Sequence, residues 1–130
     1  MPVSGLDPYD DQNIFAKILR GELPCKKVFE DEWALAFHDI APQMPVHVLV
    51  IPRGRYVSLA DFTRGASEAE IAGFFRAVAR VATQLGLEDA GYRTLANMGP
   101  DSGQAVPHFH VHLLAGRAMG ARLVPARAEG

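Results

Sequence analysis

The segment PHFHVHLLAGR, residues 107–117, places three of the chain's five histidines at alternate positions: His108, His110 and His112. If this segment is a β-strand, alternate side chains share one face, and successive histidines lie about 6.6 Å apart along the backbone. An imidazole can ligate a metal, transfer a proton or act as a nucleophile. The spacing therefore raises three hypotheses: a metal site, a catalytic site, or a polar edge of a sheet.

The metal hypothesis is limited by distance. On a strand the two outer histidines would be about 13 Å apart at the backbone, too far for all three to reach one ion. A neighbouring pair joined by a histidine from elsewhere, such as His47, could still form a zinc site. A structural role at a polar sheet edge would not explain why three imidazoles lie side by side.

The catalytic hypothesis is favoured by the residues just upstream. A neutral imidazole is a good nucleophile toward phosphorus, and a neighbouring imidazole can donate a hydrogen bond to the phosphate oxygens. The preceding stretch NMGPDSGQAV contains Gly103, and glycines allow the backbone N–H groups of a loop to approach an anion closely. Asn97 and Gln104 add neutral donors. Together these features predict an anion site with a histidine nucleophile.

The elements that must position these residues form one α+β domain. The length of 130 residues and the hydrophobic fraction of 48% suit a single core. Apolar spacing predicts a short helix at 12–21 and a long helix at 67–86, and Ser67 with Glu70 forms a capping-box pattern. Strand patterns cover 26–31, 33–39, 46–51, 91–98 and 107–114. Short links between most strands favour a mainly antiparallel sheet, with a core of about 12–118, a leader at 1–11 and a tail at 119–130.

Two strand predictions concern how side chains are buried. Residues 46–51, VHVLVI, are almost entirely apolar and β-branched, which is typical of a central strand that is buried on both faces. In the strand before it, alternation would place Trp33, Leu35, Phe37 and Asp39 on one face. His38 would then point away from Asp39.

The composition argues against several classes of function. The net charge of −2, without a basic stripe, argues against broad binding to nucleic acid or to membrane surfaces. No apolar run approaches the length of a membrane span, and no targeting segment is evident. Cys25 is the single cysteine, which excludes an internal disulfide and favours a reducing compartment. The expected location is the cytoplasm.

Several blocks of the sequence resemble one known family. GQAVPHFHVHLL, residues 103–114, resembles the Gln-x-Val-x-His-x-His-x-His signature of the histidine triad (HIT) family. FHDIAPQMPVHVLVIPR at 37–53 resembles the nucleoside-binding segment of that family, and NIFAKILRGELP and LAGR resemble its Hint branch, the nucleoside phosphoramidases. The matches run from about residue 12 to about residue 120. They imply a HIT-like fold, a five-stranded sheet with one long and one short helix, continued across a homodimer.

The resemblance also implies a role for each residue of the motifs. His110 would attack the α-phosphorus, while His112 and the backbone at Ala105 and Val106 would hold the phosphate oxygens, assisted by Gly103, Gln104 and Asn97. His108 and His47 would orient the nucleophile. Asp39 would accept the ribose hydroxyls, although it could instead cap a turn. The base would lie among apolar residues that could equally be core: Ile14, Phe15, Phe37, Ile40 and Leu49. The family's chemistry needs no metal and no cofactor.

The implied activity is hydrolysis of the P–N bond of purine nucleoside 5′-phosphoramidates, derivatives of AMP or GMP, through a nucleotidyl-histidine. Two alternatives are a dinucleoside polyphosphate hydrolase of the same superfamily and a nucleotide-binding regulatory module with weak catalysis. The chain departs from the Hint pattern at two places. Ala105 stands where many Hint members carry a hydroxyl residue, and the tail lacks the aromatic, proline-rich ending of the animal proteins.

Overall fold

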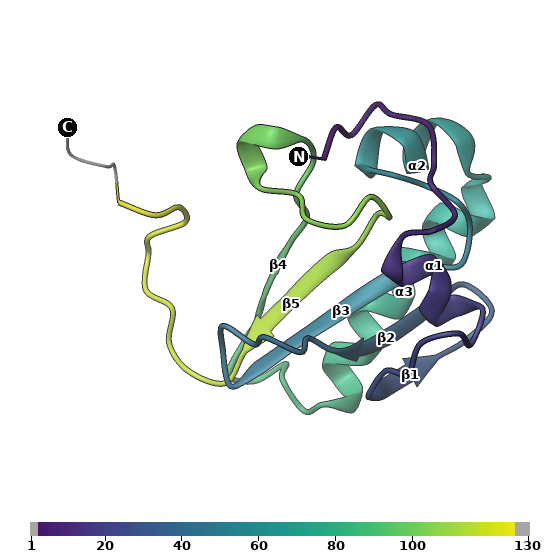
Figure 1. The fold of residues 1–130 in the computed structure, drawn as a ribbon. Coiled ribbons are helices and arrows are strands. Elements are labelled where there is room, and N and C mark those ends of the chain that lie inside the picture. Colours follow the sequence, from purple (N-terminus) through teal and green to yellow (C-terminus); the bar gives the residue numbers. More distant parts are fainter. Residues whose placement is uncertain (1–2, 127–130) are drawn as a thin grey trace.

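A computed structural model describes residues 3–126 and has an α+β architecture (Figure 1). The helices are α1 (Ile14–Leu19), α2 (Leu59–Gly65) and α3 (Glu68–Gln84), with a 3-10 turn at Pro100–Ser102. The strands are β1 (Lys27–Glu30), β2 (Ala34–His38), β3 (Val46–Pro52), β4 (Arg93–Leu95) and β5 (Val111–Ala115). The predicted α+β class and the number of strands are confirmed. The outer ends of the expected leader and tail lie outside the described residues.

The five strands form one sheet in the order β1-β2-β3-β5-β4, and every neighbouring pair is antiparallel. The apolar strand β3 lies at the centre, as its sequence predicts, and residues 47–52 are buried. In this register Leu49 of β3 pairs with His112 of β5. The central strand therefore places part of the histidine row beside buried apolar residues.

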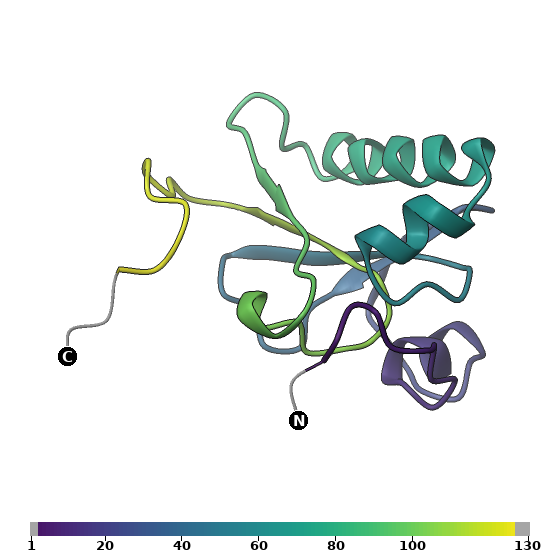
Figure 2. The same ribbon diagram turned by 90° about the horizontal axis from the view of Figure 1, so that it is seen from above.

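One face of the sheet is covered by α3, with α2 beside it (Figure 2). The main core lies here and includes Phe62, Phe74 and Phe109, whose rings pack together at centroid distances of 5.1 to 5.5 Å. The predicted capping box of Ser67 and Glu70 is present at the start of α3. These helices cover one face of the sheet and leave the opposite face of the sheet uncovered.

The opposite face carries a smaller apolar cluster with α1 against it. Its buried members are Phe15, Leu35, Phe37, Leu49 and Ile51. Because side chains alternate along a strand, His47 shares this face with Leu49, and His112 lies beside them on β5. Helix α1 has only six residues, so it covers part of this face and leaves the histidine end open.

The structure differs from the expected elements at four places. Helix α2 was not predicted; it begins at Ser58, whose hydroxyl accepts from the Asp61 amide. Strand β4 is shorter than expected, and β5 begins at Val111 rather than at residue 107, so the first two histidines of the row precede the strand. Trp33 does not share a face with Leu35: it precedes β2 and lies against Gly73 of α3. A Cβ on Gly73 would lie 2.4 Å from the Trp33 ring, so this contact requires glycine.

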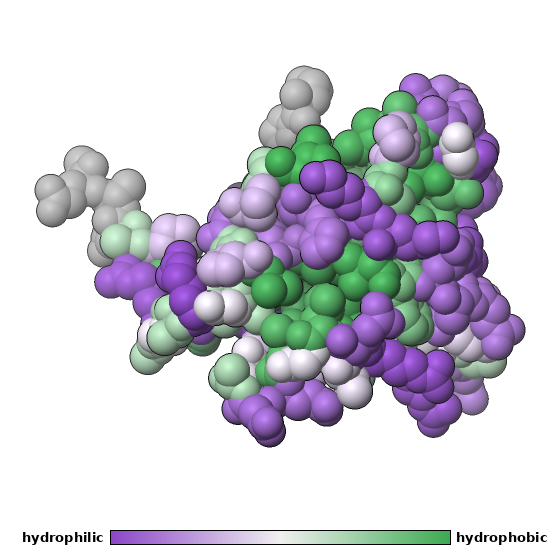
Figure 3. Space-filling model, turned by 90° about the horizontal axis from the view of Figure 1, so that it is seen from below, coloured by the Kyte–Doolittle hydropathy of each residue, from purple (hydrophilic) through white to green (hydrophobic). Residues whose placement is uncertain are grey.

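Between residues 3 and 126, no helix combines the length and the apolar character needed to cross a membrane. The underside of the molecule carries apolar side chains at its centre, with hydrophilic side chains around them (Figure 3).

Candidate active site

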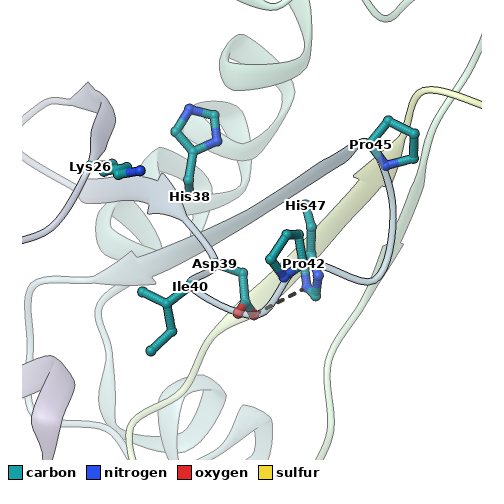
Figure 4. Close-up of a pocket in the computed structure, with 7 residues that line it drawn as sticks. All are labelled: Lys26, His38, Asp39, Ile40, Pro42, Pro45 and His47. Atoms are coloured by element: carbon teal, nitrogen blue, oxygen red, sulfur yellow. Dashed lines mark ion pairs between the residues drawn. The ribbon is translucent and has the colours of Figure 1, made fainter.

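Three segments bring the polar groups of the site together. Asp39 follows β2, His47 lies on β3 and His112 lies on β5. His47 Nε2 is 2.9 Å from His112 Nδ1 and 3.4 Å from Asp39 Oδ2. Figure 4 shows the Asp39 carboxylate facing the His47 ring, while the ring of His38 projects to the other side, as alternation predicts. The sheet register thus joins residues that are up to 73 positions apart.

The hydrogen bonds of His47 fix its tautomer and that of His112. The backbone amide of Gln43 donates to His47 Nδ1 at 3.0 Å, so this nitrogen carries no proton and the ring proton lies on Nε2. His47 Nε2 then donates to His112 Nδ1. The proton of the neutral His112 ring therefore lies on Nε2, where it is available as a donor to an anion.

His110 has the opposite arrangement, which suits a nucleophile. Its Nδ1 donates to the backbone carbonyl of His108 at 2.7 Å, so the lone pair lies on Nε2. The ring is buried and lies between Phe15, at 5.0 Å between centroids, and His112, at 5.1 Å. Those contacts restrict the rotation of the His110 ring.

His108 is fully buried and hydrogen-bonded at both ring nitrogens. Nε2 donates to the Pro52 carbonyl at 2.9 Å, and Nδ1 lies 2.6 Å from the hydroxyl of Tyr9. Since Nε2 carries the proton, Nδ1 accepts from Tyr9. His108 therefore faces the protein interior, and its backbone carbonyl is what reaches His110.

Burial keeps the histidine row uncharged at neutral pH. Desolvation lowers the pKa of His108 to about 4, helped by the nearby His110. Desolvation also lowers the pKa of His112 to about 4, together with repulsion from His110 and His47. The pKa of His110 is lowered as well, chiefly by desolvation, against the opposing pull of its bond to the His108 carbonyl. A neutral His110 is the form that can attack phosphorus.

Two adjoining cavities meet at Asp39. One is a largely apolar cavity of about 470 Å³, and its lining includes several of the predicted base contacts and the edge of the histidine row. The residues that line it are Ile14, Phe15, Ile18, Leu23, Pro24, Cys25, Lys26, Phe37, His38, Asp39, Ile40, Leu49, Ala105, Val106, His110 and His112. A second, of about 520 Å³, is lined by Lys26, His38, Asp39, Ile40, Pro42, Pro45 and His47 (Figure 4). The apolar cavity is of a size that suits a small organic ligand.

Asp39 caps a turn and also borders the two cavities. Oδ1 accepts from the Ala41 amide at 2.8 Å, so the carboxylate does cap a turn. Oδ2 faces His47 and the shared wall of the cavities. A ligand hydroxyl at Asp39 would therefore meet a carboxylate whose orientation is already fixed.

The glycine loop before the histidines is ordered by Gln104. Its Nε2 donates to the carbonyls of Val57 and Val106 at 2.8 and 3.1 Å, and its Oε1 accepts from the Gly99 amide at 3.0 Å. Both amide hydrogens are thus used by the protein, and none remains for a phosphate. Gln104 holds the loop that presents the Ala105 and Val106 backbone; Asn97 and Gly103 lie outside the residues that line the apolar cavity. Gly103 adopts φ +77°, which favours glycine.

One group of side chains could hold a metal ion: single ligand atoms of Asp39, His47 and His112 all lie within 4.8 Å of one another. Ligation through His47 Nε2 would require its proton to move to Nδ1. There it would meet the Gln43 amide hydrogen, since that amide already donates to Nδ1 at 3.0 Å. The backbone therefore opposes metal binding by the same hydrogen bond that orients His47 and His112.

The sequence motifs do not include every residue at this site. Tyr9, the Pro52 carbonyl and the Gln43 amide fix histidine rings from segments outside the row. Ile18 and Leu23 complete the apolar cavity. The apolar spacing of α1 is a signal that could have added Ile18, whereas the contact of Tyr9 with a residue 99 positions away has no signal in a single sequence.

Residues 20–119 match the family model of the HIT domain. The chain belongs to the HIT family. An uncharacterised HIT-like protein of Azospirillum brasilense is 61% identical over 112 residues, covering 86% of this chain and 92% of that protein. A maize protein named "14 kDa zinc-binding protein" is 47% identical over 116 residues, covering 85% and 86%.

Solved structures of HIT proteins share the fold. A HIT family hydrolase from Clostridium thermocellum is 36% identical, with a TM-score of 0.78, covering 88% of this chain and 99% of that one. A histidine triad nucleotide-binding protein from Candida albicans is 28% identical, with a TM-score of 0.76, covering 92% and 87%. The sheet, its order and the helix on one face are therefore those of a HIT protein.

Proposed function

We propose that this HIT protein is a Hint-like hydrolase that cleaves the P–N bond of purine nucleoside 5′-phosphoramidates. The observation that carries the proposal is the pair of opposite tautomers beside one cavity. His110 presents a lone pair on Nε2, and His112 presents an N–H on Nε2. A nucleophile and an oxyanion donor are the two groups that attack at phosphorus requires.

The reaction would proceed in two steps. In the first, His110 Nε2 forms a bond to the α-phosphorus while the P–N bond breaks, and the departing amine takes the bonding electrons and a proton from solvent water. The nucleotidylated ring is cationic, and its Nδ1–H donates to the His108 carbonyl, which stabilises that charge. In the second, water attacks phosphorus, the P–Nε2 bond breaks, and the water proton is released as the nucleoside monophosphate leaves.

The nucleoside would occupy the apolar cavity, with the ribose toward Asp39. The side chains lining this cavity provide stacking and apolar contact, from Phe15, Phe37 and Leu49 among others. The name of the Candida albicans relative and those of the hydrolase structures support a nucleotide substrate and a hydrolytic reaction. AMP and GMP derivatives are the ligands we propose.

The homodimer and the cytoplasmic location are also proposals. The edges of the sheet are β1 and β4, and β4 has three residues, of which two are exposed. Pairing of one such edge with its copy would continue the sheet across two subunits. The single cysteine, Cys25, is free, which suits a reducing compartment.

Two other functions share parts of this site. A dinucleoside polyphosphate hydrolase would use the same nucleophile, and a regulatory nucleotide-binding module would need the cavity without it. Turnover of an adenosine 5′-phosphoramidate and of a diadenosine polyphosphate should be measured with the wild type and with His110→Asn. The proposal requires faster turnover of the phosphoramidate and its loss in the variant. Turnover that survives in His110→Asn would refute the histidine nucleophile, and a preference for the diadenosine compound would favour the first alternative.

A further inference from the structure

Tyr9 has no part in the mechanism above, yet its hydroxyl lies 2.6 Å from His108 Nδ1 and its ring packs edge-on against that imidazole. We propose that Tyr9 is a positioning residue for the nucleophile: it fixes the His108 ring, and thereby the backbone carbonyl that orients His110. The kinetic part of this inference rests on the proposed function. The structural part concerns the orientation of His110 alone.

The hydrogen bond has one direction. His108 Nε2 donates its proton to the Pro52 carbonyl, so Nδ1 can only accept. The pKa of the Tyr9 hydroxyl is raised, chiefly by burial, which keeps it protonated and able to donate. The charged groups around Tyr9 are Arg55, Asp11 and Arg20, and the Asn13 side chain also contacts the hydroxyl.

His108 depends on these ring bonds because its backbone lies outside the sheet. Residues 107–110 precede β5, and their backbone is held instead by the Phe109 amide, which belongs to the same peptide unit as the His108 carbonyl and donates to the Tyr56 carbonyl at 2.7 Å. The carbonyl of His108 accepts from His110 Nδ1 at 2.7 Å. Without the Tyr9 hydroxyl, the buried Nδ1 of His108 would lack a hydrogen-bond donor, and the His108 ring would be held only through Nε2. The peptide unit of the His108 carbonyl would then be anchored only through the Phe109 amide, so the carbonyl could tilt about that bond and the His110 lone pair would move with it.

The segment that carries Tyr9 is itself anchored to the body of the protein. Arg55 donates through two nitrogens to the Asp11 carboxylate at 2.8 and 2.9 Å, and its guanidinium lies 5.1 Å from the centre of the Tyr9 ring. The Ser58 hydroxyl donates to the Gly5 carbonyl at 2.8 Å. The segment passes α2 on its way to α1 (Figure 1). A cation over the ring and contacts on both sides hold Tyr9 against His108.

The direct test is Tyr9→Phe, which removes one oxygen and keeps the ring. Tyr56→Phe is the matched control, because it removes a phenol hydroxyl that donates to Glu70 at 2.7 Å and keeps the Tyr56 carbonyl that accepts from Phe109. With an adenosine 5′-phosphoramidate, we expect the first-turnover rate of Tyr9→Phe to fall about tenfold. KM should stay within about twofold, since Tyr9 does not line the apolar cavity. Tyr56→Phe should match the wild type in both.

Nitrogen-15 NMR of the histidine rings provides a readout that does not need turnover. In the wild type, His110 should show a single tautomer with an unprotonated Nε2; in Tyr9→Phe, its two ring nitrogens should shift toward averaged values. Unchanged His110 resonances and an unchanged rate would overturn the proposal, as would a loss of stability with a normal rate per folded molecule. If the wild type hydrolysed nothing while Tyr9→Phe still shifted His110, positioning would stand and the proposed function would fail.

Discussion

At His110 the position of one proton decides whether the ring can react. The His108 carbonyl takes the Nδ1 proton, which leaves the lone pair on Nε2 at the cavity. His112 is the opposite tautomer. The Gln43 amide donates to His47 Nδ1, and His47 Nε2 donates to His112 Nδ1, so the His112 proton lies on Nε2. The row of similar residues in the sequence therefore contains an acceptor, a donor and a structural ring. Their differences come from two backbone groups, the His108 carbonyl and the Gln43 amide, and not from the side chains of the motif.

The first prediction concerns pH. Only neutral His110 can attack, and burial lowers its pKa below the ordinary value of 6.5. As pH falls through 6.5, kcat/KM should therefore stay constant. It should decline only at a more acid pH, at which His110 becomes protonated. Activity that already falls at or above pH 6.5 would contradict attack by a buried, neutral His110.

The second prediction concerns Asp39 and the ribose. Asp39→Asn should weaken binding of a nucleoside monophosphate by about 1.5–3 kcal/mol at most, because a charged acceptor for the hydroxyls is lost. The 2′-deoxy analogue should lose less, since it offers one hydroxyl fewer. Isothermal titration of both ligands with both proteins measures the difference. Equal losses would mean that Asp39 acts only through the turn it caps at Ala41.

The third prediction concerns Ala105, which lines the cavity beside His110 and His112. A hydroxyl at this position could relay a proton to the departing amine, and alanine cannot. Ala105→Ser should raise turnover of alkyl phosphoramidates by up to about tenfold, or about 1.4 kcal/mol of barrier. Good leaving groups, such as an anilide, should hardly respond because they depart without protonation. The same gain for both classes would refute the relay.

At the scale of elements, local sequence patterns predict the strands and the long helix, but they do not predict the residues at which these elements begin and end. The continuous apolar run of β3 and the capping box of α3 are strong signals, and both elements appear where expected. Helix α2 was missed because its seven residues carry too short a pattern to distinguish a helix from a loop. Strand β5 starts late because the Phe109 amide donates to the Tyr56 carbonyl, which lies outside the strands, and the His108 ring bonds to Pro52 and Tyr9.

The site could be predicted only as far as its motifs extended. His110, His112, His47 and Asp39 line the two adjoining cavities, whereas His108 faces the protein interior. The bonding of Gln104 could not be predicted, because its partners at Val57 and Gly99 depend on how the loop packs. The same holds for Tyr9, since a contact across 99 positions is created by the fold.

The fourth prediction concerns the loop that Gln104 holds. Gln104→Ala would leave buried backbone groups at Gly99, Val57 and Val106 without partners, which should cost about 1–3 kcal/mol of the free energy of unfolding. Urea denaturation measures that loss. Ser102→Ala, which removes a single bond to the Gly99 carbonyl, is the milder control. A Gln104→Ala protein of normal stability but weakened phosphate binding would instead favour the direct contact that the family resemblance implies.

At the scale of the whole molecule, the two faces of the sheet have different roles. The α3 layer supplies the main core, and the opposite face, with its smaller cluster under α1, is left open for a ligand. The N-terminal segment joins the two, because it contacts both the start of α2 and the histidine row. The residues of the candidate site therefore lie on or beside β2, β3 and β5, and Tyr9 of the N-terminal segment contacts His108 from outside the sheet.

The fifth prediction concerns metal removal from the whole protein. The Gln43 amide opposes ligation by His47, so protein treated with EDTA and shown by elemental analysis to be metal-free should keep its phosphoramidate turnover. The name of the maize relative makes zinc the ion to add back. Loss of turnover on treatment and its recovery with zinc would establish a metal at Asp39, His47 and His112 and overturn the mechanism proposed here.

The most direct test of the central claim is mass spectrometry of the intact protein, quenched in acid-free denaturant during turnover of an adenosine 5′-phosphoramidate. A histidine nucleophile predicts a transient adduct of one adenylyl group, which peptide mapping should place on His110, and which should be missing from His110→Asn. Turnover without any adduct, under conditions in which chemistry is fast and hydrolysis of the intermediate is slow, would contradict the claim. So would an adduct mapped to another residue.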